Sequence, residues 1–470
     1  MAVVNDLAKV FGVSIPDQRS TERRAINGVR REVSLCFHMV GMLPIYEVAV
    51  GLIAHEAPRH MGLVLQILSL FVGPRKLVIV VAIASVLTLT ACSANGSASP
   101  AVRNAAACTM VSAADVIPER GVMFGVNLDW GTESLQKFSA RLGLKPAVAV
   151  SFTNLPMSAT DLQNINGAVD QVRAINGTLL LTLEPRSGLA AITTEVANDL
   201  AVRLARFNAS GVPVIVRFAH EMNGSWYAWG QQPTAYIAAY REVAKAVHRV
   251  APGSSMMWAP NYAGGYPFSG GAFEAKPGSA DFSALDTNGD GVLTLADDPY
   301  APYYPGDDVV DWVGMSLYHW GSKYPWGKSE VPEDGKFAAQ LTGNYNGLGG
   351  DDTAAPDFYQ IYGVEHRKPV AIPETAALVV PNGDTALELS IKQAWWRQVF
   401  SSETATRFPQ LHMINWFEWN KFEPEVRAKV DWTIGRNDAV LKAFVGDIPT
   451  WVIPARPGVA CAAAANTPAK

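Results

Sequence analysis

The sequence has little charge and few cysteines, and each shortage excludes a class of protein. Charged residues make up 17% of the 470 residues, and the acidic ones outnumber the basic ones, which leaves a net charge of −5. Nucleic acids are bound by basic surfaces, so we expect no nucleic-acid partner. The four cysteines show no zinc-ligand spacing. Apolar residues reach 49%, which suits a globular chain with a large core.

A long membrane-spanning run is missing as well. The apolar run at 77–91 is shorter than the roughly 20 residues that a transmembrane helix needs. It follows Arg75 and Lys76, as the apolar core of a signal peptide follows its charged start. The run ends in Leu-Thr-Ala before Cys92, which resembles the lipobox of bacterial lipoproteins. The resemblance implies a signal peptide at 73–91, a lipid on Cys92, and an extracytoplasmic protein that is anchored to the cell membrane or secreted. The alternative is a plain membrane anchor that ends in cysteine.

The segments at the two ends of the chain are expected to lie outside the main domain. Residues 1–72 precede the signal peptide, which favours an over-extended start; a genuine cytoplasmic or membrane-associated leader is the alternative. We expect poor order there. Residues 92–110 form a linker and residues 456–470 a tail. Cys108 and Cys461 are expected to form a disulfide, with two free thiols as the alternative.

Between these ends, short apolar segments alternate with longer helical stretches. This alternation predicts βα units and a parallel sheet. The expected strands are 121–128, 145–152, 177–185, 212–221, 254–260, 309–318, 368–374 and 411–419. Eight such strands predict a (β/α)8 TIM barrel, and we expect one catalytic domain over residues 111–455.

The expected strands end in polar and aromatic side chains. In a (β/α)8 barrel the active site lies at the carboxyl ends of the strands. Residues at these ends here are Asn127, Glu184, His220, Glu221, Tyr318, Glu374 and Trp416. A strand that only packs into a core has no need to end in a carboxylate, so Glu221 and Glu374 predict chemistry at this rim.

The segment after the fourth expected strand reads RFAHEMNGSWYAWG, residues 217–230. It resembles the signature of glycoside hydrolase family 26, the β-mannanase-like enzymes. The resemblance implies that Glu221 is the general acid/base and that His220 orients sugar hydroxyls or the catalytic carboxylates. Arg217 and Trp226 are then expected at the substrate. A zinc site of the HExxH type is excluded, because residue 224 is glycine.

The seventh expected strand, KPVAIPE, resembles the nucleophile strand of the same family and makes Glu374 the nucleophile. By itself, Glu374 equally suits the start of a helix. Paired with Glu221 it suits a retaining glycosidase, in which one protonated carboxyl assists the leaving oxygen and one ionised carboxylate traps the sugar. We expect the charge of the nucleophile to raise the pKa of the acid.

The segment YYPGDDVVDWVG at 303–314 also resembles the family, and it leads to Tyr318. The resemblance implies that Tyr318 hydrogen-bonds the nucleophile. Trp416 is expected to form the floor under the sugar at the cleavage point, and Trp226 and Trp258 to line further subsites, with Asn127 at the rim.

These residues together predict a retaining endo-β-glycosidase that acts on a polysaccharide, with β-1,4-mannan as the first substrate. The same mechanism on β-1,3-xylan or mixed-linkage β-glucan is the alternative within the family. A non-catalytic polysaccharide-binding lipoprotein and a structural envelope lipoprotein are the alternatives outside it. We expect a monomer with no organic cofactor.

A loop between the fifth and sixth expected strands, residues 286–297, follows the EF-hand pattern. Oxygen-bearing side chains stand at positions 1, 3 and 5, a glycine at 6 and an acid at 12. The expected ligands of a structural calcium ion are Asp286, Asn288, Asp290, Val292, Thr294 and Asp297. The alternative is an Asp/Gly-rich turn without an ion.

Overall fold

The structure is a computed structural model that describes residues 111–322, 327–346 and 355–455. The predicted lipid site at Cys92 and the predicted disulfide between Cys108 and Cys461 lie outside these residues. Among the described helices, none is both long enough and apolar enough to span a membrane.

Eight parallel strands pair in sequence order, and the first also pairs with the last, which closes the sheet into a barrel. The strands are β1 (Val122–Leu128), β2 (Val148–Asn154), β3 (Thr178–Glu184), β4 (Val214–Phe218), β5 (Ser254–Trp258), β6 (Trp312–Gly314), β7 (Val370–Thr375) and β8 (Leu411–Glu418). Each overlaps a range that the sequence predicted, and β2 and β7 run one or two residues past the end of theirs. The predicted TIM barrel is therefore confirmed.

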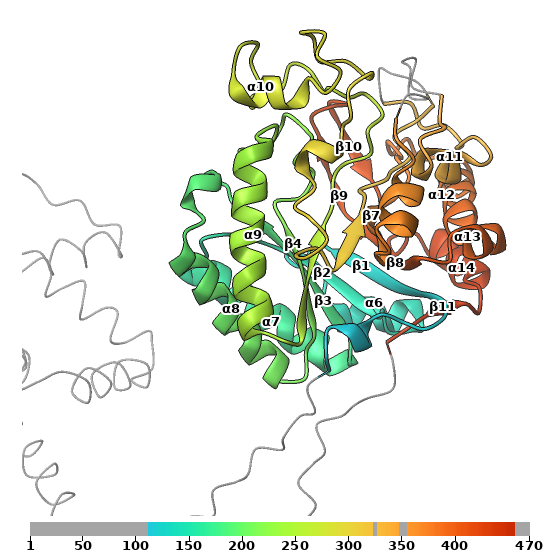
Figure 1. The fold of residues 1–470 in the computed structure, drawn as a ribbon. Helices are drawn as coiled ribbons and strands as arrows, with labels where there is room; N and C mark the ends of the chain where they lie inside the picture. The colour runs from blue at the N-terminus through green and yellow to red at the C-terminus, as the bar shows by residue number, and fades with distance from the viewer. Residues whose placement is uncertain (1–110, 323–326, 347–354, 456–470) are drawn as a thin grey trace, which may run out of the picture. The chain divides into compact units, whose positions relative to one another are not determined.

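Helices surround the strands, and α10, which contacts α9, lies at the top of the view in Figure 1. The α-helices are α6 (Leu135–Leu142), α7 (Ala159–Ile175), α8 (Thr194–Ala209), α9 (Pro233–Val250), α10 (Ala280–Leu285), α11 (Lys336–Leu341), α12 (Thr385–Val399), α13 (Ser402–Arg407) and α14 (Asp438–Asp447). Several begin at a serine, threonine or aspartate whose side chain accepts a hydrogen bond from the first turn, as Ser158 does for α7.

Three further strands add to the barrel. A hairpin of β9 (Asn420–Glu423) and β10 (Ala428–Asp431) follows β8 directly. The short strand β11 (Val452–Ile453) pairs with the start of β1 on the outside of the ring. The hairpin starts where β8 ends, so it stands at the carboxyl end of the barrel.

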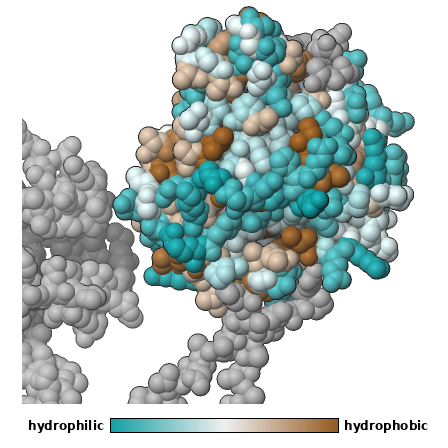
Figure 2. All heavy atoms as spheres, in the orientation of Figure 1, coloured by the Kyte–Doolittle hydropathy of each residue, from teal (hydrophilic) through white to brown (hydrophobic). Residues whose placement is uncertain are grey.

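The barrel strands have two apolar faces that alternate along the sequence. The inward face forms one cluster, to which every strand contributes: Met123, Val148, Val150, Leu180, Ile215, Met257, Trp312, Ala371 and Met413. The outward face packs against the helices in a second, larger cluster. This alternation decides which side chains near the strand ends point into the barrel mouth. The face seen in Figure 2 is mostly hydrophilic, and its apolar patches are small and separate.

Candidate active site

Polar side chains replace apolar ones where the inward face reaches the carboxyl end of the barrel. Two residues beyond Ile215 on β4, the inward position is Arg217, which is fully buried. Arg217 pairs in register with Thr182 of β3, so the two side chains point to the same face. The inward row of β6 continues to Ser316, which accepts a hydrogen bond from Arg217 Nη2 at 2.6 Å. A buried guanidinium thus stands in the centre of the mouth.

Glu374 reaches the same place through an irregularity in β7. Ala371 points inward, so strict alternation would turn residue 374 toward the helices. The register between β7 and β8 shifts between Ile372 and Thr375, as a β-bulge does. After the shift Thr375 faces outward, where its hydroxyl accepts a hydrogen bond from Trp395 of α12 at 2.9 Å. The bulge therefore turns Glu374 into the barrel.

The Glu374 carboxylate is held by a donor on each oxygen. Arg217 Nη1 donates to Oε1 and forms a buried ion pair. The Tyr318 hydroxyl donates to Oε2 at 2.7 Å. Both carboxylate oxygens of Glu374 therefore have a donor from the barrel, and the contact with Arg217 is charge-assisted. The contact between Tyr318 and Glu374 is the one that the family resemblance implied.

Glu221 follows β4 in a strained turn. Its φ is 54° and that of Ala219 is 47°, in a region that residues other than glycine rarely adopt. The Glu221 amide donates to the Ala259 carbonyl at 2.9 Å, which ties the turn to the end of β5. Strain of this kind is common at functional sites, where the surrounding structure holds it in place.

The surroundings of Glu221 favour its protonated form. Burial, followed by the negative charge of Glu374, raises its pKa to about 7, against the opposing effect of Arg217. Trp226 Nε1 donates to Glu221 Oε2 at 3.2 Å, which opposes the rise. The two glutamates therefore lie close enough to interact, and the acid has the perturbed pKa that the sequence predicted.

His220 is buried within aromatic rings. Its ring lies 5.0 Å from that of Tyr227 and 5.5 Å from that of Phe152, measured between centroids. Burial and the nearby charge of Arg217 lower its pKa well below the usual value. His220 is therefore a neutral imidazole at neutral pH, and it shapes the wall of the site beside Glu221 without adding charge.

Comparison with known proteins finds a family that this region is similar to. The model of glycosyl hydrolase family 26 matches residues 183–259, which run from the end of β3 to the end of β5 and include Arg217 and Glu221. The resemblance to family 26 is confirmed.

Other relatives resemble the chain over a longer stretch. Endoglucanase H from Acetivibrio thermocellus is 22% identical over 320 residues, which are 66% of this chain and 28% of that protein. The chain thus spans under a third of this relative. Among solved structures, an endo-β-1,4-mannanase double mutant from Cellulomonas fimi is 18% identical at a TM-score of 0.47, with 77% of this chain and 79% of that chain covered. GH26C from Muricauda sp. is 14% identical at a TM-score of 0.46, with 72% and 88% covered.

Two tryptophans that the sequence assigned to the substrate are instead part of the outer core. Trp258 and Trp416 are both 0% exposed, and both belong to the outward-facing cluster. Trp258 stacks on Phe358 at 5.9 Å between centroids. Trp416 packs against Phe444 of α14 and donates to the Trp432 carbonyl at 2.9 Å. These two predictions were wrong, because strand alternation turns both side chains away from the barrel mouth.

Aromatic residues next to Trp416 occupy the mouth instead. Phe417 pairs in register with Asn127, and its ring lies 5.7 Å from that of Tyr318. Trp419 stacks on Phe417 at 5.9 Å and donates to Asn127 Oδ1 at 3.2 Å. Asn127 is completely buried, so it holds Trp419 in place and presents no surface to a sugar. Counting alternate residues from an inward position on β8 would have found Phe417.

Trp226, unlike Trp258 and Trp416, remains accessible to solvent. It lies in segment 217–230, which resembles family 26. It is 38% exposed, and its ring meets the edge of Phe268 at 5.1 Å. Phe268 lies in the loop after β5, which is bound to the loop after β4 by two hydrogen bonds between Asn223 and Asn261, at 2.8 and 2.9 Å. A flat ring is thus fixed beside the Glu221 carboxyl.

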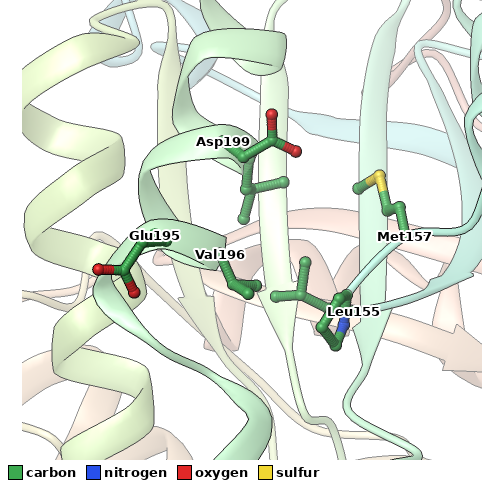
Figure 3. A pocket seen from close by; sticks show the side chains of 7 residues that line it. Leu155, Met157, Glu195, Val196 and Asp199 are labelled. Atoms are coloured by element: carbon green, nitrogen blue, oxygen red, sulfur yellow. The ribbon is translucent and has the colours of Figure 1, made fainter.

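A shallow pocket lies away from these glutamates, between α8 and the loop after β2. Its lining consists of Leu155, Pro156, Met157, Glu195, Val196, Asp199 and Leu200. Figure 3 shows Val196 and Leu155 facing each other across it. Asp199 is engaged by Arg203 at 2.8 Å. The pocket contains neither glutamate of the candidate site, so we assign it no part in the chemistry.

The loop predicted to bind calcium is closed by its own backbone amides. The carboxylate of Asp286 accepts from the amides of Asp290 and Gly291, at 3.1 and 2.9 Å. Asp297 accepts from the amides of Thr287 and Thr294, at 2.8 and 2.9 Å. Among the described residues no three histidine, cysteine or acidic side chains form a group able to hold a metal ion. The calcium site stays a prediction from the sequence pattern.

Proposed function

We propose that the chain hydrolyses a β-linked polysaccharide as a retaining endo-β-glycosidase. The observation that carries the proposal is the unequal treatment of two neighbouring carboxyls. Glu374 accepts hydrogen bonds from Arg217 and Tyr318, whereas burial and the charge of Glu374 raise the pKa of Glu221 to about 7. A pair of carboxyls with separated protonation states is what acid-assisted glycoside cleavage needs.

In the first step Glu374 attacks the anomeric carbon of the bound sugar. The bond from that carbon to the glycosidic oxygen breaks, and the proton of Glu221 moves to the departing oxygen. Glu221, now ionised, next takes a proton from water as the water oxygen attacks the same carbon. The bond to Glu374 breaks, and both carboxyls return to their starting forms. The configuration at the anomeric carbon is retained after two displacements.

We propose β-1,4-mannan as the first substrate, on the resemblance of the family 26 segment to β-mannanases. Mixed-linkage β-glucan is the second candidate, since the relative from Acetivibrio thermocellus is named an endoglucanase. β-1,3-Xylan is a third. A binding protein without activity is less favoured, because holding a neutral polysaccharide requires no proton-bearing acid beside an ionised carboxylate.

The test is hydrolysis of mannan, galactomannan, β-1,3-xylan and lichenan by the full chain, beside Glu221→Ala and Glu374→Ala. Hydrolysis of one polymer that both substitutions abolish supports the proposal and names the sugar. Retained hydrolysis in Glu374→Ala would exclude a Glu374 nucleophile. Binding of a polymer by wild type without release of reducing ends would favour the binding protein.

Two further proposals follow from the sequence patterns. We propose that the loop at 286–297 binds calcium as a structural ion, with no part in the chemistry. Thermal unfolding of the full chain with added calcium and with a chelator tests this. An increase in Tm with calcium that Asp290→Ala abolishes supports the site, and equal Tm values contradict it. We also propose that a lipid on Cys92 anchors the protein to the membrane. Cys92→Ser should then move the protein from the membrane fraction into the soluble fraction.

A further inference from the structure

A third glutamate lies at the mouth of the barrel and has no part in the two-step mechanism. Glu184 is the last residue of β3, two positions after Thr182 and four after Leu180 on the inward face. Residues two apart on a strand point to the same side, so the Glu184 side chain points into the mouth. Burial is the main cause that raises the pKa of Glu184; the charge of Glu374 adds to the rise, and Arg186 and Arg217 oppose it. Glu184 therefore stands near the proposed nucleophile.

The two oxygens of Glu184 have different surroundings. Oε2 accepts two hydrogen bonds from the Arg186 guanidinium, at 2.7 and 3.1 Å. Oε1 accepts no hydrogen bond from the residues that the structure describes. It is nevertheless not completely buried, so a ligand or water can reach it. One oxygen is thus fixed by an arginine, and the other is left able to accept a hydrogen bond.

A second strand-end glutamate shows what a purely structural carboxylate looks like in this fold. Glu418 ends β8 and is 7% exposed, as Glu184 is. It lies an odd number of positions after the inward Met413 on β8, so it faces the helices. Its two oxygens accept hydrogen bonds from the Ile434 and Gly435 amides, at 2.8 and 2.7 Å. Glu418 has its acceptors filled by the fold, whereas Glu184 keeps one acceptor for a ligand.

Placing Glu184 near the Glu374 carboxyl is electrostatically unfavourable. Like charges at short range oppose ionisation, and burial adds to this cost. The arginine offsets part of it through a paired, charge-assisted contact. A residue that the fold keeps at such a cost, with one oxygen left without a donor among the described residues, suits a partner that donates hydrogen bonds. The hydroxyl groups of a sugar are such donors.

We propose that Glu184, held by Arg186, is a specificity-determining residue that accepts hydrogen bonds from hydroxyl groups of the sugar bound beside Glu374. The inference rests on the proposed function and deepens it. Epimeric sugars such as mannose and glucose direct one hydroxyl differently, so a fixed acceptor distinguishes them. A site that hydrogen-bonds a particular hydroxyl discriminates strongly against a sugar that lacks a hydroxyl in that place, because the polar group of the site is then left unpaired.

Glu184→Gln tests the proposal, since it keeps the shape and removes the charge. We expect kcat/KM on the preferred polysaccharide to fall about 10- to 100-fold, the effect of one hydrogen bond to a charged group. We expect a smaller fall on the epimeric polymer, so that the ratio of the two kcat/KM values changes about tenfold or more. Equal losses on both polymers, or no loss, would overturn the proposal.

Glu418→Gln is the matched control, and it is expected to lower Tm without changing the ratio. Glu184→Asp is the second variant if Glu184→Gln does not fold; it keeps the charge, withdraws the oxygen and should also change the ratio.

Binding separates this proposal from that of hydrolysis. The tryptophan fluorescence of the full chain is titrated with mannohexaose and with cellohexaose. If the wild type hydrolyses neither polymer but Glu184→Gln changes which oligosaccharide binds more tightly, the proposed hydrolase is refuted and the recognition role of Glu184 stands. If the wild type is active and Glu184→Gln leaves the binding preference unchanged, the hydrolase stands and the recognition role of Glu184 is refuted. Binding of neither oligosaccharide at millimolar concentration, without hydrolysis, would overturn both.

Discussion

Glu221 and Glu374 are the same residue type at neighbouring places, and the molecule treats them in opposite ways. Glu374 has an arginine and a tyrosine hydroxyl on its carboxylate oxygens. Glu221 has a long hydrogen bond from Trp226, and burial and the nearby charge of Glu374 raise its pKa to about 7. The comparison teaches that the proposed roles are set by the neighbours and not by the glutamates themselves.

The backbone reaches the two positions by different means. β7 turns Glu374 inward through a register shift against β8. Glu221 lies beyond the end of β4, in a turn with positive φ at two residues. The bulge leaves Glu374 inside the strand ladder with a donor on each oxygen. The turn instead places Glu221 beyond the strand, beside Trp226, which is 38% exposed. A nucleophile benefits from rigid placement, and an acid from access to the departing oxygen.

The largest expected effect comes from Glu374→Gln, which removes the anion and keeps the side-chain shape. Loss of a covalent nucleophile should lower kcat on the polysaccharide by at least about 10⁴-fold. The loss should be similar for an aryl β-glycoside with a good leaving group, because the first displacement still needs the anion. Thermal unfolding checks that the buried Arg217 has not destabilised the variant. Activity within tenfold of wild type would end the distinction between the two glutamates.

Glu221→Gln should show the opposite dependence on the leaving group. General acid catalysis contributes about 10²- to 10⁴-fold, so hydrolysis of the polysaccharide should fall by that factor. Formation of the glycosyl-enzyme from an aryl β-glycoside should change far less, since a good leaving group departs without a proton. A burst of aryl alcohol in stopped-flow measurements detects this difference. Equal losses on both substrates would contradict the role of Glu221 as acid.

Tyr318→Phe removes one of the two donors to Glu374. A hydrogen bond to a charged group contributes about 1.5–3 kcal/mol, so we expect kcat/KM to fall about 10- to 100-fold. The variant keeps the ring that packs on Phe417, and its Tm should stay close to that of wild type. A fall in Tm with unchanged kcat/KM would show that the tyrosine only packs.

The smallest expected effect is a shift in the pH profile. Glu221 must be protonated for the first step, so activity should decline as the pH rises through about 7, its pKa. The hydrogen bond from Trp226 lowers this pKa. Trp226→Phe removes the bond, so the pKa should rise and the alkaline limb of kcat/KM should move to higher pH. A limb that stays in place or moves to lower pH would show that another group controls it.

The sequence predicted the eight strands because each is a short apolar run between helical stretches, and local patterns of this kind need no knowledge of distant contacts. It also predicted Glu221 and Glu374 as residues at strand ends, and the contact between Tyr318 and Glu374. It failed at Trp258 and Trp416. Both are aromatic residues near strand ends, and aromatic content alone does not say which face of a strand a side chain occupies.

By itself, the sequence determined the barrel, the family resemblance and the residue types at the mouth, since these depend on local periodicity and short motifs. Only the tertiary structure decided which side chains meet there. The inward orientation of Glu374 depends on a register shift between β7 and β8. The ion pair between Arg217 and Glu374 joins residues 157 positions apart in the chain. It also showed Glu184 with one oxygen fixed and one open. Such contacts arise from closing the sheet, which brings together strand ends that the sequence keeps far apart.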